Sequence, residues 1–169
     1  EHVYDKTQPE NLPFLGRIRP LLAEYMRLGL NPATVGRVPI PGFTAAPTPP
    51  APEFVKRLAA LPLMSQPGTK WAYSMSLDVL GIIIALASGK PSLGAFLSER
   101  MFGPLGMESS FFEVPEAEKP RLTSNYANFA GMPIPIDHGR DSVFAEPPAF
   151  DFGGAGLVCS AHDYDRFLA

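Results

Sequence analysis

Proline and glycine constrain this chain more than any other feature of its sequence. Twenty of its 169 residues are Pro and 15 are Gly, together about a fifth of the chain where about an eighth is usual. Seven of the prolines lie within residues 31–52. Because Pro lacks an N–H and has a fixed φ, this stretch cannot form a helix or a central strand. We interpret residues 31–52 as a Pro-rich loop or flap and expect many turns elsewhere.

The rest of the composition is that of a globular protein, with 46% hydrophobic and 18% charged residues. The net charge of −3 leaves no basic surface for nucleic acid, so we expect no nucleic-acid partner. The longest nearly unbroken apolar run, Val79–Ala87, is about half as long as a membrane-spanning helix, so we expect no membrane span. The single cysteine, Cys159, lies in an apolar stretch and is expected to be a buried thiol.

Both ends of the sequence suggest a segment of a larger protein. The chain opens at Glu1 without an initiator Met and closes within a helix-like pattern over residues 160–169. We therefore expect residues 1–169 to be a partial domain.

Apolar spacing and stop signals predict helices separated by turns. The predicted helices cover Pro20–Gly29, a stretch that starts at Pro52, Ser74 or Ser76 through Ser88, Ser92 to about Met101, and the C-terminal residues. The third of these is apolar on nearly all sides and is expected to be the buried centre. Gly103-Pro104 is expected to stop the fourth. Residues 121–128 and 132–136, separated near Gly131, predict a weak hairpin.

The chain lacks the motifs that would support catalysis alone. It contains neither Ser-x-x-Lys nor Gly-x-Ser-x-Gly. Its three histidines, His2, His138 and His162, do not have the spacing of metal ligands. We expect no metal ion and no cofactor.

One turn nevertheless concentrates reactive groups. Residues 67–76 place Tyr73, Ser74 and Ser76 at the start of the most apolar helix, where backbone N–H groups favour an anion. A phenol at this place can exchange protons if a cation lowers its pKa. Spacing alone also permits aromatic packing at Tyr73 and helix capping by the serines. The spacing leaves both interpretations open and favours the second.

Five elements in order resemble one enzyme family. They are Pro67-Gly-Thr-x-Trp-x-Tyr73-Ser74, Asp78-Val-Leu-Gly81, Ser88-Gly-Lys-Pro91, Phe96-Leu-x-Glu-Arg-Met-Phe-x-Pro104-Leu-Gly-Met107 and, later, Gly153-Gly-Ala-Gly-Leu-Val-Cys-Ser160. This pattern resembles the serine β-lactamase-related hydrolases, which include class C β-lactamases, D-Ala-D-Ala peptidases and family VIII carboxylesterases. The resemblance covers about residues 54–112 and 153–169.

The resemblance implies a mechanism and a fold. In this family a Ser of a Ser-x-x-Lys motif is acylated while Lys and Tyr transfer protons, and the matching Tyr here is Tyr73. Since Ser-x-x-Lys is absent, the remainder of the hydrolase chain is needed to complete the site, and this chain alone is expected to be inactive. The implied fold class is mostly α with long loops and little β, the helical, lid-bearing part of a β-lactamase/transpeptidase-like α/β fold.

One departure from the family pattern bears on the substrate. The family's Tyr-x-Asn reads Tyr73-Ser74-Met75 here, and a thioether cannot hold a substrate amide as Asn does. We therefore favour hydrolysis of a small-molecule ester, with Ser74 and Met75 as substrate-binding residues. A β-lactamase or D-Ala-D-Ala peptidase acting on β-lactam-like amides, and a non-catalytic binding homologue, remain as alternatives.

Overall fold

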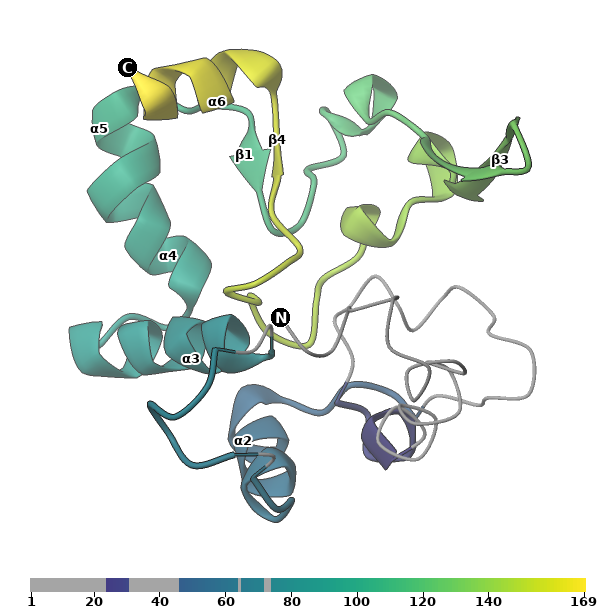
Figure 1. Cartoon of the computed structure of the whole chain (residues 1–169). Coiled ribbons are helices and arrows are strands. Elements are labelled where there is room, and N and C mark those ends of the chain that lie inside the picture. Colours follow the sequence, from purple (N-terminus) through teal and green to yellow (C-terminus); the bar gives the residue numbers. More distant parts are fainter. Residues whose placement is uncertain (1–23, 31–45, 64, 72–73) are drawn as a thin grey trace.

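The computed structural model describes residues 24–30, 46–63, 65–71 and 74–169. Its labelled helices are α2 (Ala51–Ala59), α3 (Ser76–Ser88), α4 (Leu93–Leu97), α5 (Gly103–Leu105) and α6 (Ala161–Leu168). Its strands are β1 (Ser110–Phe111), β2 (Asn125–Phe129), β3 (Met132–Asp137) and β4 (Val158–Cys159). Figure 1 shows α3, α4, α5 and α6 arranged around the β1–β4 pair, with the β2–β3 hairpin at the opposite side. Within the described residues helices outweigh strands, as expected of a helical segment, and the expected lid stays a prediction.

The bounds of α2 and α3 follow from their end residues. Pro52 lies in the first turn of α2, where its missing N–H costs no hydrogen bond. The α3 helix begins at Ser76 and ends at Gly89, which adopts a left-handed conformation with φ of 65°. The prediction of a helix from Ser74 or Ser76 through Ser88 is therefore confirmed.

The fourth helix does not end at Gly103-Pro104, so this prediction was wrong. After α4 the helix widens into a π-helical turn over Ser98–Phe102 and then continues as α5. The N–H of Gly103 bonds the carbonyl of Ser98, five residues back, and Pro104 occupies the first turn of α5. A π turn opens the backbone and admits the proline ring that would clash in a regular α-helix. The helix ends at Gly106, which has a φ of 64°.

The main core lies where α2 and α3 meet the segment Phe150–Gly154. Its buried members are Leu30, Phe54, Ile82 and Phe152. The rings of Phe54 and Phe150 pack edge to face at 5.0 Å, and those of Phe150 and Phe152 lie 4.1 Å apart. Three mutually contacting aromatic rings therefore join α2 to a segment about a hundred residues later in the chain.

Only one side of α3 is buried, so the expectation that this helix is the buried centre was wrong for the described residues. Asp78, Gly81 and Ile82 are its buried residues. The apolar side chains on its other side are exposed, namely Leu77, Leu80, Ile83 and Leu86, the last by 76%. The apolar composition of α3 thus exceeds what its contacts within the described chain require.

The buried side of α3 makes a close backbone crossing with Gly153. A Cβ on Gly153 would lie 2.0 Å from the carbonyl oxygen of Leu77, and a Cβ on Gly81 would lie 3.1 Å from the backbone of Gly153. Real Cβ atoms essentially never come within 3.0 Å of another atom, which rules out the first contact and makes the second a tight one. The crossing therefore requires glycine at position 153 for steric reasons.

The two small strand pairs are antiparallel. In the β2–β3 hairpin, Ala130 and Gly131 take positive φ values of 50° and 86°, as a tight two-residue turn requires. In the other pair Ser110 lies opposite Cys159. The Cys159 side chain is exposed, so the expectation of a buried thiol was wrong. Pairing with β1 occupies one edge of this two-residue strand and does not cover the Cys159 side chain, which projects from its face.

Two other expectations fall partly outside the described residues. Of the predicted helix Pro20–Gly29, residues 24–27 are described and helical, and Gly29 has the positive φ of a helix end. Of the Pro-rich segment 31–52, residues 31–45 lie outside the described part, and residues 46–50 have neither helix nor strand. Over the described ranges no single helix is both long and apolar enough to cross a membrane. The pair formed by α3 and residues 93–105 reaches that length and composition only with a 67° bend.

Gly153→Ala tests the close crossing. We expect this substitution to lower the free energy of unfolding by at least about 3 kcal/mol, because the new methyl group meets backbone that cannot move aside. Urea denaturation measures the change. Gly131→Ala is the matched control: it introduces strain at a positive φ with open space around the Cβ, at a cost of about 1–2 kcal/mol. A Gly153→Ala variant no less stable than Gly131→Ala would contradict the crossing.

Candidate active site

The described part of the predicted site is the turn Ser74–Ser76. Tyr73, the predicted proton-transferring residue, lies outside the described residues. The hydroxyl oxygens of Ser74 and Ser76 lie 2.6 Å apart, and the backbone N–H of Ser76 donates to the Ser74 hydroxyl at 3.2 Å. Both serines are exposed. The pair therefore fixes the turn at the start of α3 and leaves hydroxyl groups accessible to a ligand.

Met75 lies between the two serines and faces the core. It is half-buried, occupies the N-cap position of α3 and packs against the cluster of Leu30, Phe54, Ile82 and Phe152. Its side chain offers no amide group at the position where the family pattern has Asn. The packing gives Met75 a structural role, and its role in substrate binding stays a prediction.

Asp78, in the first turn of α3, links this turn to the segment after Phe152. Its side chain is 5% exposed, and its Oδ1 accepts a hydrogen bond from the N–H of Gly154 at 2.9 Å. Burial raises the pKa of the Asp78 carboxyl, and the hydrogen bond from Gly154 offsets this effect only in part. Asp78 therefore joins two segments that lie 76 residues apart in the sequence.

The segment Phe150–Gly154 also contacts the start of α4. Oδ2 of Asp151 accepts the backbone N–H of Gly94 at 2.7 Å, at the start of α4. The hydroxyl of Ser92 accepts the neighbouring N–H of Ala95 at 3.2 Å. Two of the free N–H groups at this helix end are thus satisfied, one of them by a carboxylate.

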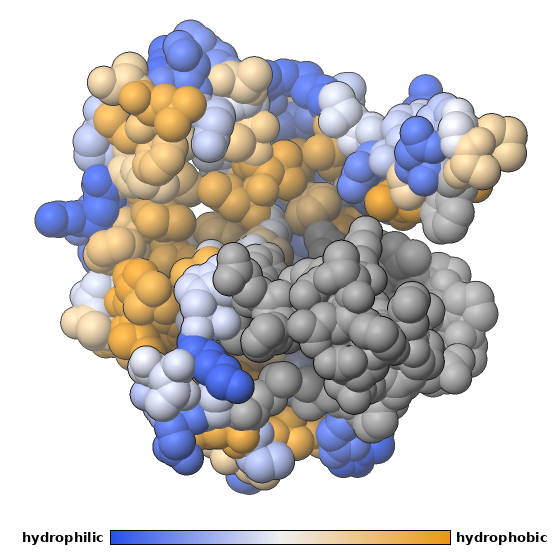
Figure 2. All heavy atoms as spheres, viewed as in Figure 1, coloured by the Kyte–Doolittle hydropathy of each residue, from blue (hydrophilic) through white to orange (hydrophobic). Residues whose placement is uncertain are grey.

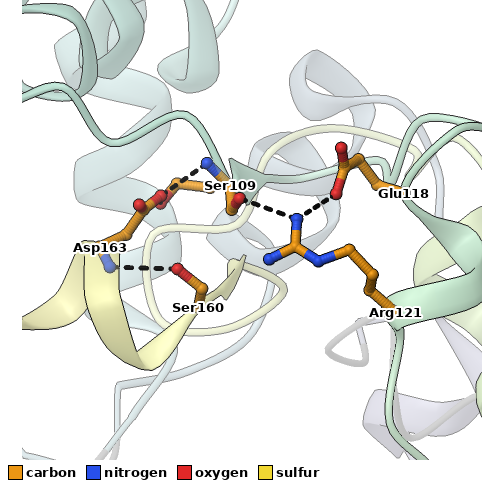
Figure 3. A network of polar contacts seen from close by, with 6 residues as sticks. Ser109, Glu118, Arg121, Ser160 and Asp163 are labelled. Carbon is orange, nitrogen blue, oxygen red and sulfur yellow. Dashed lines mark hydrogen bonds and ion pairs between the residues drawn. The ribbon is translucent and has the colours of Figure 1, made fainter.

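A second buried carboxylate, Asp163, forms a polar network away from this turn (Figure 3). Its Oδ2 accepts from the N–H of Ser109 at 2.7 Å and from the hydroxyl of Ser110 at 2.8 Å. Its own N–H donates to the hydroxyl of Ser160 at 3.1 Å, which caps α6. Burial acts to raise the pKa of Asp163, but the hydrogen bonds from Ser110 and Ser109 hold it below its ordinary value. This network fastens α6 to β1, which is a structural role.

Sequence reasoning quoted Asp78 only as part of a motif and assigned it no role. One signal was present, since Asp78 is the one charged residue in the otherwise apolar stretch 77–87. A charged residue in a buried helix turn needs a hydrogen-bond partner. The identity of that partner, Gly154, required the structure.

Asp78→Asn tests the electrostatics of this link. The variant keeps an oxygen for the Gly154 N–H but has no ionisable proton. Because the folded-state pKa is raised, the wild type is most stable below the ordinary aspartate pKa of about 3.9 and loses stability as the pH rises through the folded pKa. We expect Asp78→Asn to melt at a higher temperature than the wild type at about pH 7, with the difference shrinking toward about pH 4.

Asp163→Asn is the control, for which we expect a change in melting temperature of the opposite sign. The pKa of Asp163 is lowered, so its contribution is present above the ordinary aspartate value and is lost as the pH falls through the folded pKa. This variant should melt below the wild type at neutral pH. If Asp78→Asn melts below the wild type at neutral pH, as Asp163→Asn is expected to do, burial does not raise the Asp78 pKa.

Comparison with known proteins identifies the family of this chain. The family model described as Beta-lactamase matches residues 26–169. Esterase EstB of Burkholderia gladioli is 36% identical over 69% of this chain and 33% of its own length. Acyltransferase calJ of Penicillium decumbens is 33% identical over 99% of this chain and 36% of its own length.

A solved structure agrees with this result. EstCE1, a hydrolase with promiscuous acyltransferase activity, is similar with a TM-score of 0.62 and 25% identity, over 88% of this chain and 44% of that chain. The chain spans about a third of the length of the two curated relatives. From the family match over residues 26–169 and these relatives, the chain belongs to the serine β-lactamase-related hydrolase family.

Proposed function

We propose that this chain is the central part of a serine hydrolase that cleaves small carboxylic esters through an acyl-enzyme. The observation that carries the proposal is the Met75 side chain, which packs against the core where amide-cleaving members of the family present Asn. The turn thus offers the exposed hydroxyls of Ser74 and Ser76 but no amide to pair with a substrate amide. The similarity to Esterase EstB supports the same substrate class.

In the proposed mechanism Tyr73 transfers protons. The nucleophilic Ser and the Lys of a Ser-x-x-Lys motif come from outside this chain. Tyr73 starts as the phenolate, stabilised by the cationic Lys of that motif. It accepts the proton of the Ser hydroxyl as the new Ser–acyl bond forms, and donates this proton to the leaving alkoxide as the ester bond breaks. Water then attacks the acyl-enzyme while Tyr73 takes its proton. Tyr73 returns this proton to the Ser oxygen as the Ser–acyl bond breaks and the acid is released. Ser74 contributes a hydroxyl that contacts the substrate.

The exposed apolar face of α3 supports the need for the rest of the hydrolase. Leu77, Leu80, Ile83 and Leu86 form this face, and Figure 2 shows hydrophobic residues gathered over α3 and lining the hollow beside α4 and α5. Contiguous apolar surface of this kind marks an interface. We propose that residues 1–169 form a partial domain whose apolar face is covered by the remainder of the hydrolase chain. The Pro-rich segment 31–52 would shape the substrate pocket.

A second candidate function is transfer of the acyl group to an alcohol. It is favoured by the similarity to Acyltransferase calJ and to EstCE1, whose description includes promiscuous acyltransferase activity. An alcohol would attack the same acyl-enzyme in place of water, so both functions use one site. Adding an alcohol acceptor to an ester assay and quantifying the new ester against the free acid distinguishes the two functions.

Tyr73→Phe in the full-length hydrolase tests the proposed function. The variant keeps the ring but loses the hydroxyl, so we expect kcat on p-nitrophenyl acetate to fall by at least about 100-fold while the protein still folds. Tyr126→Phe, at an exposed tyrosine of β2, is the matched control and should keep the wild-type kcat. A wild-type kcat for Tyr73→Phe would mean that Tyr73 is a packing residue. This chain assayed alone should be inactive, because a proton-transferring group has no nucleophile to act on.

Met75→Asn tests the substrate class. We expect the wild type to prefer short-chain esters over a chromogenic cephalosporin in kcat/KM, and Met75→Asn to narrow this preference by about 10-fold through one added hydrogen bond. The melting temperature should fall, since Asn places a polar group against the core. Met75→Leu should leave both quantities unchanged. An unchanged preference with a lower melting temperature would make Met75 a core residue only. A wild type that cleaves cephalosporins as fast as esters would favour the β-lactamase alternative.

A further inference from the structure

The β2–β3 hairpin has two outer backbone edges, and they differ in what they can bind. The hairpin stands apart from α3–α6, and its two strands mainly contact each other (Figure 1). Ala130 and Gly131 form its two-residue turn, and Phe129 lies opposite Met132. In such a hairpin the pair next to the turn exchanges two backbone hydrogen bonds, and bonded and non-bonded pairs then alternate. Every second residue therefore directs its backbone N–H and C=O groups away from the hairpin.

Proline closes the outer edge of β3. The residues of β3 whose backbone groups face outward in this register are Pro133 and Pro135, which lie opposite Asn128 and Tyr126. Proline has no backbone N–H, so neither residue donates a hydrogen bond to an added strand. Natural edge strands often carry Pro or Lys, because an open edge pairs with other chains. The outer edge of β3 is thus protected against extension of the sheet.

The outer edge of β2 is open. Tyr126 and Asn128 are exposed, and in the described part of the chain their outward N–H groups donate to no acceptor. The Asn128 side chain is engaged at the turn, where its Oδ1 accepts the N–H of Gly131 at 2.9 Å. The stretch from Leu122 to Ile136 contains no charged residue. The edge of β2 therefore presents two free backbone donors and neither the Pro nor the Lys that usually blocks such an edge.

The register of β2 permits pairing with a second copy of the same strand. With two β2 strands antiparallel and Ala127 opposite Ala127 of the second copy, Tyr126 of each copy lies opposite Asn128 of the other. Each of these two pairs exchanges two hydrogen bonds, so all four outward N–H groups find a carbonyl. Both copies use the same edge, so the contact closes on itself. Two neutral strands also meet without like-charge repulsion, whereas a charged segment gains no attraction from this edge.

We propose that the outer edge of β2 joins two copies of the full-length hydrolase into a dimer through a four-stranded sheet in the order β3–β2–β2–β3. A protected β3 edge lies at each side of this sheet, so the assembly stops at two copies. Pairing of two five-residue strands is small beside the roughly 1,200 Å² that a standard interface buries, so the dimer is reversible and depends on concentration. This inference does not depend on the proposed function.

Sedimentation velocity of the full-length hydrolase over a range of about 1–200 µM tests the dimer. We expect the mean mass to rise with concentration from one copy toward two and not beyond. Tyr126→Pro removes an outward N–H from each strand, and with it two of the four hydrogen bonds. It should raise the dissociation constant by at least about 10-fold. Tyr126→Phe keeps this N–H and is the matched control, with an unchanged dissociation constant.

Charges placed at the symmetry axis test the register, and they replace Tyr126→Pro if that variant does not fold. Ala127→Lys brings two ammonium groups opposite each other and Ala127→Glu brings two carboxylates, so each variant alone should associate at least about 10-fold more weakly than the wild type. An equimolar mixture of the two variants pairs opposite charges and should recover the wild-type dissociation constant. A mixture that associates no better than either variant alone would overturn the proposal.

The double variant Pro133→Ala with Pro135→Ala restores two outward N–H groups on β3. We expect assemblies larger than two copies, because each hairpin then has two open edges. A double variant that still stops at two copies would contradict the role of the prolines.

Two further results would overturn pairing with a second copy. One is a wild-type dimer that Tyr126→Pro and Ala127→Lys leave intact, since another surface then joins the copies. The other is a single copy at all concentrations. Protection of the Tyr126 and Asn128 amides from hydrogen exchange in that single copy would show that another segment of the hydrolase covers the edge.

Discussion

The architecture of this chain depends on the segment Phe150–Gly154. Phe150 and Phe152 pack against Phe54 of α2, Asp151 accepts an N–H at the start of α4, and Gly153 crosses the backbone of α3. Gly154 then donates to Asp78. Five consecutive residues therefore contact three helices, each through a different interaction: aromatic packing, helix capping, and a close backbone approach reinforced by a hydrogen bond.

This arrangement explains why certain residue types occur where they do in the family pattern. Gly81 and Gly153 are small because two backbones approach each other, and the buried carboxyl of Asp78 accepts the backbone N–H of Gly154 that faces it. Asp78 and Asp163 are both buried, yet their pKa values shift in opposite directions. Burial raises the pKa of both carboxyls. At Asp163 the hydrogen bonds with Ser110, Ser109 and Ser160, together with the charge of Arg166, outweigh burial, whereas at Asp78 the backbone hydrogen bonds from Gly154 and from its own N–H do not.

The sequence predicted local features well because local residues determine them. Ser76 and Gly89 mark the ends of α3, and Gly131 marks the hairpin turn, since helix ends and tight turns depend on a few neighbouring residues. The stop at Gly103-Pro104 failed because a π turn accommodates the proline. The burial of α3 and of Cys159 was also mispredicted, because apolar composition does not tell which faces of an element find a partner within the chain.

The candidate site was likewise predictable where neighbouring residues determine it and not where distant residues do. The turn Ser74–Ser76 was located from spacing and family resemblance, and the structure places it at the start of α3 as predicted. Met75 packs against a core cluster whose members come from several segments, and the partner of Asp78 is Gly154, far along the sequence. Pairing at such separation is a property of the tertiary fold, and no local pattern around residue 78 specifies Gly154 as the donor.

The central proposal is that Tyr73 accepts and donates protons during cleavage of the ester. A crystal structure of the full-length hydrolase, with a phosphonate ester trapped on its nucleophile, tests this proposal most directly. The account predicts the Tyr73 hydroxyl within about 3.2 Å of a phosphonate oxygen or the nucleophile oxygen. A Tyr73 side chain packed in the core, with another residue at that distance from the phosphonate, would contradict it.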